Sequence, residues 1–163
     1  MNWALIGAST IASENMIGAI RAQAEAQIKW VVSGSADYAK TYAQAHDIPR
    51  WTVSLEEALA DDAVQAVYIS STNEKHHPQA LAAIAAGKHV LCEKPLAMTQ
   101  AEAQEMIAAA RAAGVELAVN HHLRSSAAMR AIRDVIAGGA LGQLRSVRVF
   151  HAVALPEHLH GWR

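Results

Sequence analysis

Short apolar runs alternate with alanine-rich, helix-forming stretches from residue 3 to residue 119. The runs are apolar throughout, which is typical of strands buried on both faces of a parallel sheet. Because a helical stretch and a short connection follow each run, the pattern predicts an α/β fold with a doubly wound parallel sheet of the Rossmann type. The predicted strands are 3–6, 28–32, 51–53, 64–71, 89–92 and 115–119, and they place a dinucleotide-binding domain in residues 1–120.

The first strand leads into a glycine turn, with Gly7 directly after the apolar residues. A helix from Thr10 onward would direct its free N–H groups and its positive dipole end at this turn, which favours an anion. The spacing follows the dinucleotide fingerprint G-x-G-x-x-G, with Ser9 and Ala12 in place of two glycines. Ala12 still allows close helix–strand packing, and the Ser9 hydroxyl is a candidate donor to a phosphate oxygen. An ordinary tight turn between a strand and a helix would show the same pattern.

Several residues mark helix ends. Ser54 with Glu57, and Thr99 with Glu102, have the spacing of capping boxes. Pro78 predicts a helix that contains it in the first turn, where a missing N–H does no harm.

Composition restricts the class of protein. The chain has 163 residues, of which 52% are hydrophobic and 18% are charged, as in a globular protein. A formal net charge of −1 gives no electrostatic reason to expect nucleic acid or a membrane surface as a partner. The single cysteine, Cys92, fits a reducing compartment, and we find neither a leader pattern nor an apolar run of about 18 residues. We therefore expect a cytoplasmic protein.

Nine histidines are many for this length, but their spacing does not favour a metal. The adjacent pairs at 76–77 and 121–122 cannot share one face of a helix or strand. Only His158 and His160, with His151, have a spacing that suits metal ligands, and zinc needs three or four converging groups. We expect no metal site.

Residues 121–163 have a different pattern, which predicts the beginning of a second, α+β substrate domain. A helix is expected over 126–137, followed by a glycine pair and a half-exposed strand over 144–153. One long strand cannot cover its own apolar face, so this strand is a candidate for pairing two copies into a homodimer.

The segment after the second strand bears on the choice between NAD(H) and NADP(H). An acid there would bind the ribose hydroxyl of NAD and repel the phosphate of NADP. The sequence instead has Ser33-Gly34-Ser35, with Tyr38 placed to lie against adenine and Lys40 as the nearest cation. Asp37 is the opposing feature, although it lies one position deeper in the helix. This pattern favours NADP(H) over NAD(H), unless the serines only cap the next helix.

Lys94 lies between a predicted buried strand and Pro95, at the edge of the sheet where such folds bind ligands. A ketone that accepts hydride becomes an alkoxide, and a positioned ammonium group stabilises that charge and can donate a proton. Lys94 is therefore the candidate catalytic residue, with a solvated surface charge as the alternative. Pro95 suggests a cis peptide bond after Lys94.

The stretch from Asn73 to Leu96 has the pattern N-x-x-H, then a helix, then G-K-H-V-x-x-E-K-P. In this pattern the chain resembles the glucose–fructose oxidoreductase / inositol dehydrogenase family. The resemblance implies a sugar reductase or dehydrogenase that uses a nicotinamide cofactor and a small sugar as substrate. NADPH reductases of the family often have an arginine at the position of Tyr38, so NAD(H) stays open. The second domain of the family also contributes an Asp and a His in a D-x-x-x-H segment, and residues 1–163 do not include this segment.

Two sets of candidate residues follow from the residue patterns and the resemblance together. The cofactor contacts are Gly7, Ser9, Thr10, Ile11, Ser33, Gly34, Ser35, Tyr38, Ser71, Thr72, Asn73, His76, Glu93, Lys94 and Asn120. The substrate contacts are His76, Lys94, Arg124, His151, Trp162 and Arg163. A nucleotide-binding module with little turnover remains the alternative to an enzyme.

Overall fold

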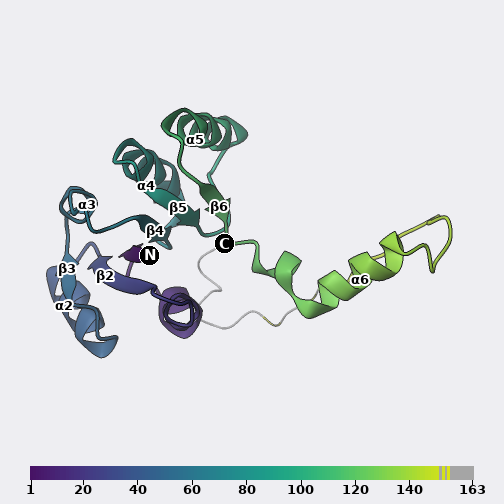
Figure 1. Cartoon of the computed structure of the whole chain (residues 1–163), viewed down its shortest axis with the longest axis horizontal. Coiled ribbons are helices and arrows are strands. Elements are labelled where there is room, and N and C mark those ends of the chain that lie inside the picture. Colours follow the sequence, from purple (N-terminus) through teal and green to yellow (C-terminus); the bar gives the residue numbers. More distant parts are fainter. Residues whose placement is uncertain (151, 153, 155–163) are drawn as a thin grey trace. The chain divides into compact units, whose positions relative to one another are not determined.

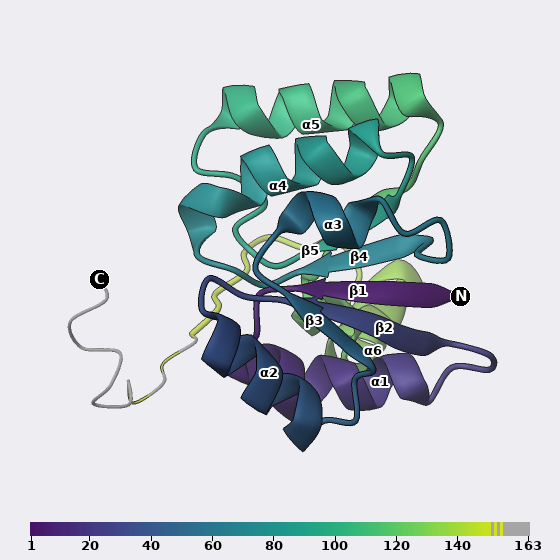
Figure 2. The same ribbon diagram turned by 90° about the vertical axis from the view of Figure 1, so that its left-hand side faces the viewer.

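Six parallel strands form one sheet in the order β3-β2-β1-β4-β5-β6 (Figures 1 and 2). The structure is a computed structural model that describes residues 1–150, 152 and 154. This strand order is that of the doubly wound dinucleotide-binding fold, and it confirms the predicted fold class. The strands are β1 (Asn2–Ile6), β2 (Gln27–Val32), β3 (Arg50–Thr52), β4 (Ala66–Ile69), β5 (His89–Cys92) and β6 (Leu117–Val119).

Helices cover both faces of the sheet, as Figure 2 shows. A π-helical segment η1 (Ala12–Met16) continues into α1 (Ile17–Arg21), and these pack with α2 (Ala36–Ala45) against one face. The other face carries α3 (Leu55–Leu59), α4 (Asn73–Ala85) and α5 (Gln100–Ala113).

Alternate residues of each strand supply the two cores. In β1, Ala4 and Ile6 belong to the core under α3, α4 and α5, whereas Leu5 belongs to the core under α1 and α2. In β4, Ile69 and Tyr68 divide in the same way. Both faces are therefore apolar, which explains why the strands show continuous apolar runs in the sequence.

The helix-end signals are confirmed in part. Thr99 and Glu102 form a complete capping box at the start of α5. Ser54 accepts a hydrogen bond from the Glu57 N–H at 3.2 Å, but the Glu57 carboxylate accepts from the Thr52 hydroxyl instead of completing the box.

The prediction for Pro78 was wrong. The helix α4 begins at Asn73, so Pro78 lies inside it rather than in its first turn. Because proline has no N–H, the carbonyl group four residues earlier in α4 lacks its helical hydrogen bond. This turn of the helix is exposed, so water can donate to that carbonyl group instead.

The chain divides into two units, residues 1–121 and 122–163, and the second is described by itself. It contains a short 3-10 turn η2 (His122–Ser125) and the helix α6 (Ala127–Ala137). Ser126 caps α6 by accepting from the Met129 N–H at 3.2 Å. The strand predicted over 144–153 was wrong for its described part, because residues 144–150 form no strand. A strand needs a hydrogen-bonded neighbour, and no other strand in the described part of this unit provides one.

Candidate functional site

The carboxyl ends of five strands are level with one another. Ile6 pairs with both Val32 and Ile69, and Cys92 pairs with both Ile69 and Val119. The residues that follow these strands therefore form a row along one edge of the sheet. This row contains Gly7, Ser33, Ser70, Glu93 and Asn120, of which all except Ser70 were predicted from the sequence. Ligands bind at this edge in doubly wound sheets, next to the strand where the winding reverses.

Gly7 brings the first turn into backbone contact with the end of β4. Its φ is +106°, a conformation that residues with a side chain rarely adopt. A Cβ at this position would lie 2.8 Å from the Ser71 nitrogen and 2.9 Å from the Ser70 carbonyl carbon. The requirement for glycine is therefore steric, because a side chain here would collide with the main chain that follows β4.

The Ser9 hydroxyl is directed into the protein. It donates to the Ser70 hydroxyl at 2.7 Å and accepts from the Ala12 N–H at 3.2 Å. The Ser9 carbonyl oxygen accepts from the Tyr42 hydroxyl at 2.9 Å. The serine hydroxyl therefore ties the turn to the residue that follows β4, and the main chain at the same position ties it to α2. The hydroxyl hydrogen that was expected to reach a phosphate is used within the protein in this arrangement.

A cleft of about 290 Å³ lies beside the glycine turn. Its walls come from the ends of β1 and β2, from the segment before α3, and from the first turns of α4. The lining residues are Ile6, Gly7, Val32, Ser33, Gly34, Val53, Leu55, Ser71, Lys75 and Gln79. The cleft has the size of part of a dinucleotide, and its described lining contains no carboxylate. Its place beside the glycine turn makes it the candidate site for part of a dinucleotide.

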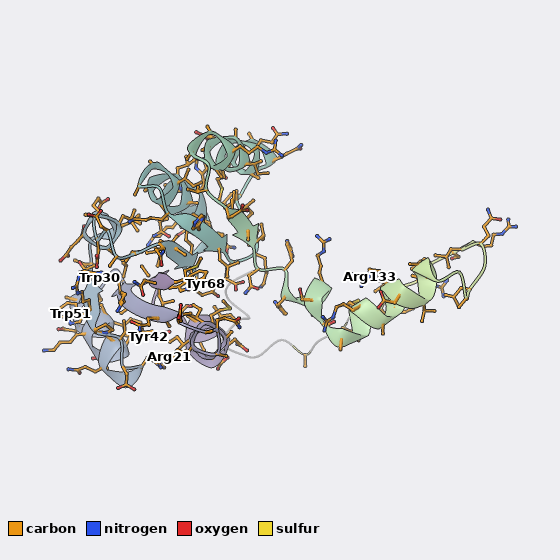
Figure 3. All side chains as sticks on the ribbon, in the orientation of Figure 1. Arg21, Trp30, Tyr42, Trp51, Tyr68 and Arg133 are labelled. Carbon is orange, nitrogen blue, oxygen red and sulfur yellow. The ribbon has the colours of Figure 1, made fainter. Side chains whose placement is uncertain are left out.

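Glu93 forms the centre of a buried hydrogen-bond network. Its Oε1 accepts from the Tyr68 hydroxyl and from the Asn120 Nδ2, both at 2.7 Å, and its Oε2 accepts from the Lys94 main-chain N–H at 3.2 Å. Burial and the hydrogen bond to the Glu93 carboxylate raise the pKa of Tyr68, which therefore keeps its proton and acts as a donor. The network joins β4, β5 and the end of β6. Figure 3 labels Tyr68 at the sheet.

Lys94 extends from this network into solvent. The residue is exposed, and the described part of the chain gives its ammonium group no hydrogen bond or ion pair. The Lys94–Pro95 peptide bond is cis, as the sequence suggested. Lys94 thus presents a cation at the carboxyl edge of the sheet, on a residue whose main chain is fixed by Glu93.

His76 was predicted to contact the cofactor and the substrate, but its side chain is buried. It is only 1% exposed, and its two ring nitrogens face main-chain carbonyl oxygens. Nδ1 lies 2.8 Å from the Pro95 oxygen, and Nε2 lies 3.2 Å from the Ser71 oxygen. The ring thus connects the loop after β4 with the loop that carries Lys94, an arrangement that favours a positioning role.

The remaining predicted residues fall into three groups. The first group, Thr10, Ile11 and Tyr38, is exposed near the glycine turn and on α2. In the same region, Ser35 caps α2, because its hydroxyl accepts from the Tyr38 N–H at 3.4 Å. Asn73 opens α4, Ser71 donates to the Gln79 side chain at 2.6 Å, and the Thr72 hydroxyl donates to Glu74. Arg124 belongs to η2 in the second unit, and His151, Trp162 and Arg163 lie outside the described residues.

Sequence reasoning missed several residues of this edge. Tyr68 lay within an apolar run, where a single hydroxyl gave the only indication of a polar partner. Ser70 was hidden in the Ser70-Ser71 pair, and no role was predicted from the sequence for Lys75 and Gln79. The signal for the last two was helical spacing, because residues four apart lie on one face.

Other kinds of site find no support in the described residues. Across residues 1–150, 152 and 154, no three His, Cys, Asp or Glu side chains converge in a way that would hold a metal ion. None of the helices described combines the length and the apolar character that a membrane span requires.

Three features are typical of a dinucleotide-binding oxidoreductase domain: a doubly wound parallel sheet, a glycine turn after its first strand, and a cleft and a lysine at the carboxyl edge. Residues 1–121 match a family of oxidoreductases with an NAD-binding Rossmann fold, the Gfo/Idh/MocA family. The chain belongs to this family, which is the one that the motif between Asn73 and Leu96 indicated.

Relatives with known activities cover most of the chain. It is 57% identical over 161 residues to a 1,5-anhydro-D-fructose reductase from Ensifer adhaerens, covering 99% of this chain and 48% of that protein. It is 35% identical to the trans-1,2-dihydrobenzene-1,2-diol dehydrogenase of Homo sapiens, covering 91% of this chain and 45% of that protein.

Solved structures show the same fold. The crystal structure of a 3-ketoreductase from Actinomadura kijaniata in complex with NADP and TDP-benzene matches with a TM-score of 0.79 and 27% identity. The match covers 85% of this chain and 42% of that one. The chain therefore spans about half the length of the relatives that it matches.

Proposed function

We propose that the chain is the nucleotide-binding part of an NADPH-dependent reductase that converts the ketone of 1,5-anhydro-D-fructose, or of a closely related sugar, to the alcohol. For the first substrate, the product is 1,5-anhydro-D-mannitol. The observation that carries the proposal is the placement of Lys94 at the carboxyl edge of the sheet. Its main-chain N–H donates to the buried Glu93 carboxylate, and its ammonium group has no partner among the described residues. The 57% identity to a 1,5-anhydro-D-fructose reductase supports this substrate over other sugars.

The cleft supports NADP(H) over NAD(H). No carboxylate of the described residues lines it, so no acid there would bind the ribose hydroxyl of NAD or repel the phosphate of NADP. Ser33 and Gly34 line the same wall, and the 3-ketoreductase with this fold was crystallised with NADP.

The residues divide the chemistry between them. A nicotinamide cofactor, when bound, supplies the hydride that reduces the ketone. Lys94 then stabilises the charge that develops on the ketone oxygen and donates the proton that makes the alcohol. Glu93 holds the Lys94 main chain through its N–H, and His76 fixes the neighbouring Pro95 carbonyl group. Together they fix the main chain from which the Lys94 side chain extends, which limits where its ammonium group can lie relative to a bound ketone.

The test is a nicotinamide fluorescence titration with NADPH, followed by an assay of NADPH oxidation with 1,5-anhydro-D-fructose. We expect micromolar binding with turnover. Lys94→Met should lower turnover by at least about 100-fold with little change in the NADPH Kd, as removal of a general acid does. Lys40→Met is the matched control and should leave both unchanged. Binding of NADPH without turnover would favour a nucleotide-binding module, and no binding of either nucleotide would reject both functions.

Pairing of two copies through residues 144–153 is a second proposal, separate from the chemistry. Among its described residues, Val147, Val149 and Phe150 are 72%, 77% and 85% exposed, so this part of the segment offers apolar side chains to a second copy. Light scattering at high concentration tests it, and a monomeric mass would contradict it.

A further inference from the structure

The described lining of the nucleotide cleft contains one charged side chain, Lys75, in the first turn of α4. The sheet order explains its proximity to the end of β2, because β2 and β4 lie on either side of β1. A helix that follows β4 therefore faces Ser33 and Gly34 across the glycine turn. A dinucleotide that crosses this turn has its adenosine ribose between the two walls.

The two other candidates for recognising the ribose lie elsewhere. Lys40 is an exposed residue of α2 and is absent from the cleft lining. Asp37 is also exposed in the first turn of α2 and is not part of the lining. The charge that a ligand would meet inside the cleft is thus positive and comes from α4.

Lys75 is also available to a ligand. Among the described residues its ammonium group has no hydrogen bond or ion pair. The neighbouring carboxylate, Glu74, accepts from the Thr72 hydroxyl. A lysine in this state binds a phosphate group as a flexible point charge, without the fixed geometry of arginine.

We propose that Lys75 recognises the 2′-phosphate of NADP and so determines the preference for NADP over NAD. The inference rests on the proposed function, since it takes the cleft as the adenosine site. A phosphate monoester carries about −1.5 to −2 charges at neutral pH, whereas the ribose hydroxyl of NAD carries none. Lys75 therefore discriminates between the two cofactors by charge. Ser33 completes the site as a neutral donor on the opposite wall.

The experiment measures the Kd values of NADPH and NADH by nicotinamide fluorescence for the wild-type chain and three variants. Lys75→Gln should weaken NADPH binding by at least about tenfold, the loss expected for a hydrogen bond to a charged group. Its NADH Kd should change by less than about twofold, because that ligand lacks the phosphate. Lys75→Arg should keep most of the preference. The matched control, Lys40→Gln, removes the same charge from a nearby helix and should change neither Kd.

Competition with adenosine 2′-phosphate and adenosine 5′-phosphate tests the same contact without nicotinamide. Only the first should bind more weakly to Lys75→Gln. An equal loss for NADPH and NADH would place Lys75 on a part that both cofactors share and would overturn the proposal. A selective loss in Lys40→Gln would overturn it as well. If the wild-type chain binds neither nucleotide, the proposed function fails, whereas wild-type binding with an indifferent Lys75→Gln rejects this inference alone.

Discussion

Replacing Gly7 by alanine tests whether the first turn must bring β1 into backbone contact with β4. The added Cβ would lie 2.8 Å from the Ser71 nitrogen and 2.9 Å from the Ser70 carbonyl carbon, at a φ of +106°. The backbone conformation costs a non-glycine residue about 1–3 kcal/mol. The contact with rigid backbone atoms adds about 1–3 kcal/mol, as overpacking does. The free energy of unfolding should therefore fall by about 2–6 kcal/mol, a large part of what such a domain has.

The matched control is Gly34→Ala, in the same edge of the sheet. An added Cβ at Gly34 meets nothing within 4 Å, and its φ is not in the positive region. Urea unfolding followed by far-UV circular dichroism measures both variants. With an m value of about 2 kcal/mol/M, the Gly7→Ala midpoint should fall by at least about 1 M, whereas Gly34→Ala should stay within about 0.5 M of the wild type. Equal midpoints for the two variants would refute the steric reasoning.

Three further predictions concern the interior and its edge. Tyr68→Phe removes a donor from the buried Glu93 carboxylate and should cost about 1–3 kcal/mol in urea unfolding; an unchanged midpoint would contradict the network. Burial raises the pKa of Cys92 to about 12, so a thiol reagent at pH 8 should label the chain only after urea is added, and rapid labelling of the native chain would be evidence against it. The hydrogen bond from the Trp30 indole lowers the pKa of Asp61. Its stabilising effect is then complete above the unfolded pKa of about 3.9 and is lost as the pH falls through the lower folded pKa. Thermal unfolding of Asp61→Asn should hence depend less on pH below about pH 4 than that of the wild type, and parallel curves would speak against this assignment.

The fold was predictable because local signals and the sheet agree. Continuous apolar runs gave the positions of all six strands, and the complete capping box at Thr99 set the start of α5. The helix around Pro78 was placed too late, because a proline in the first turn is the usual case, and nothing local shows that α4 begins at Asn73.

The site was harder to predict, because its contacts join residues that are distant in the chain. Gly7 and Glu93 each follow an apolar run, so their positions at the carboxyl edge could be derived from the sequence. The partners of Glu93 lie in β4 and after β6, and only the strand order shows that they converge. In the same way, Lys75 reaches the wall opposite β2 only because β1 separates β2 from β4. The strand predicted over 144–153 needed a neighbour that sequence patterns cannot supply.

Amide hydrogen exchange with and without NADPH tests most directly whether the chain binds a nicotinamide dinucleotide over the carboxyl ends of β1, β2 and β4. We expect slower exchange on NADPH addition in the glycine turn at residues 7–13, after β2 at 33–35 and at the start of α4 at 71–76. The amides of α2 beyond its first turn should be unchanged. Protection confined to other segments, or exchange that NADPH leaves unaltered at saturating concentration, would contradict it.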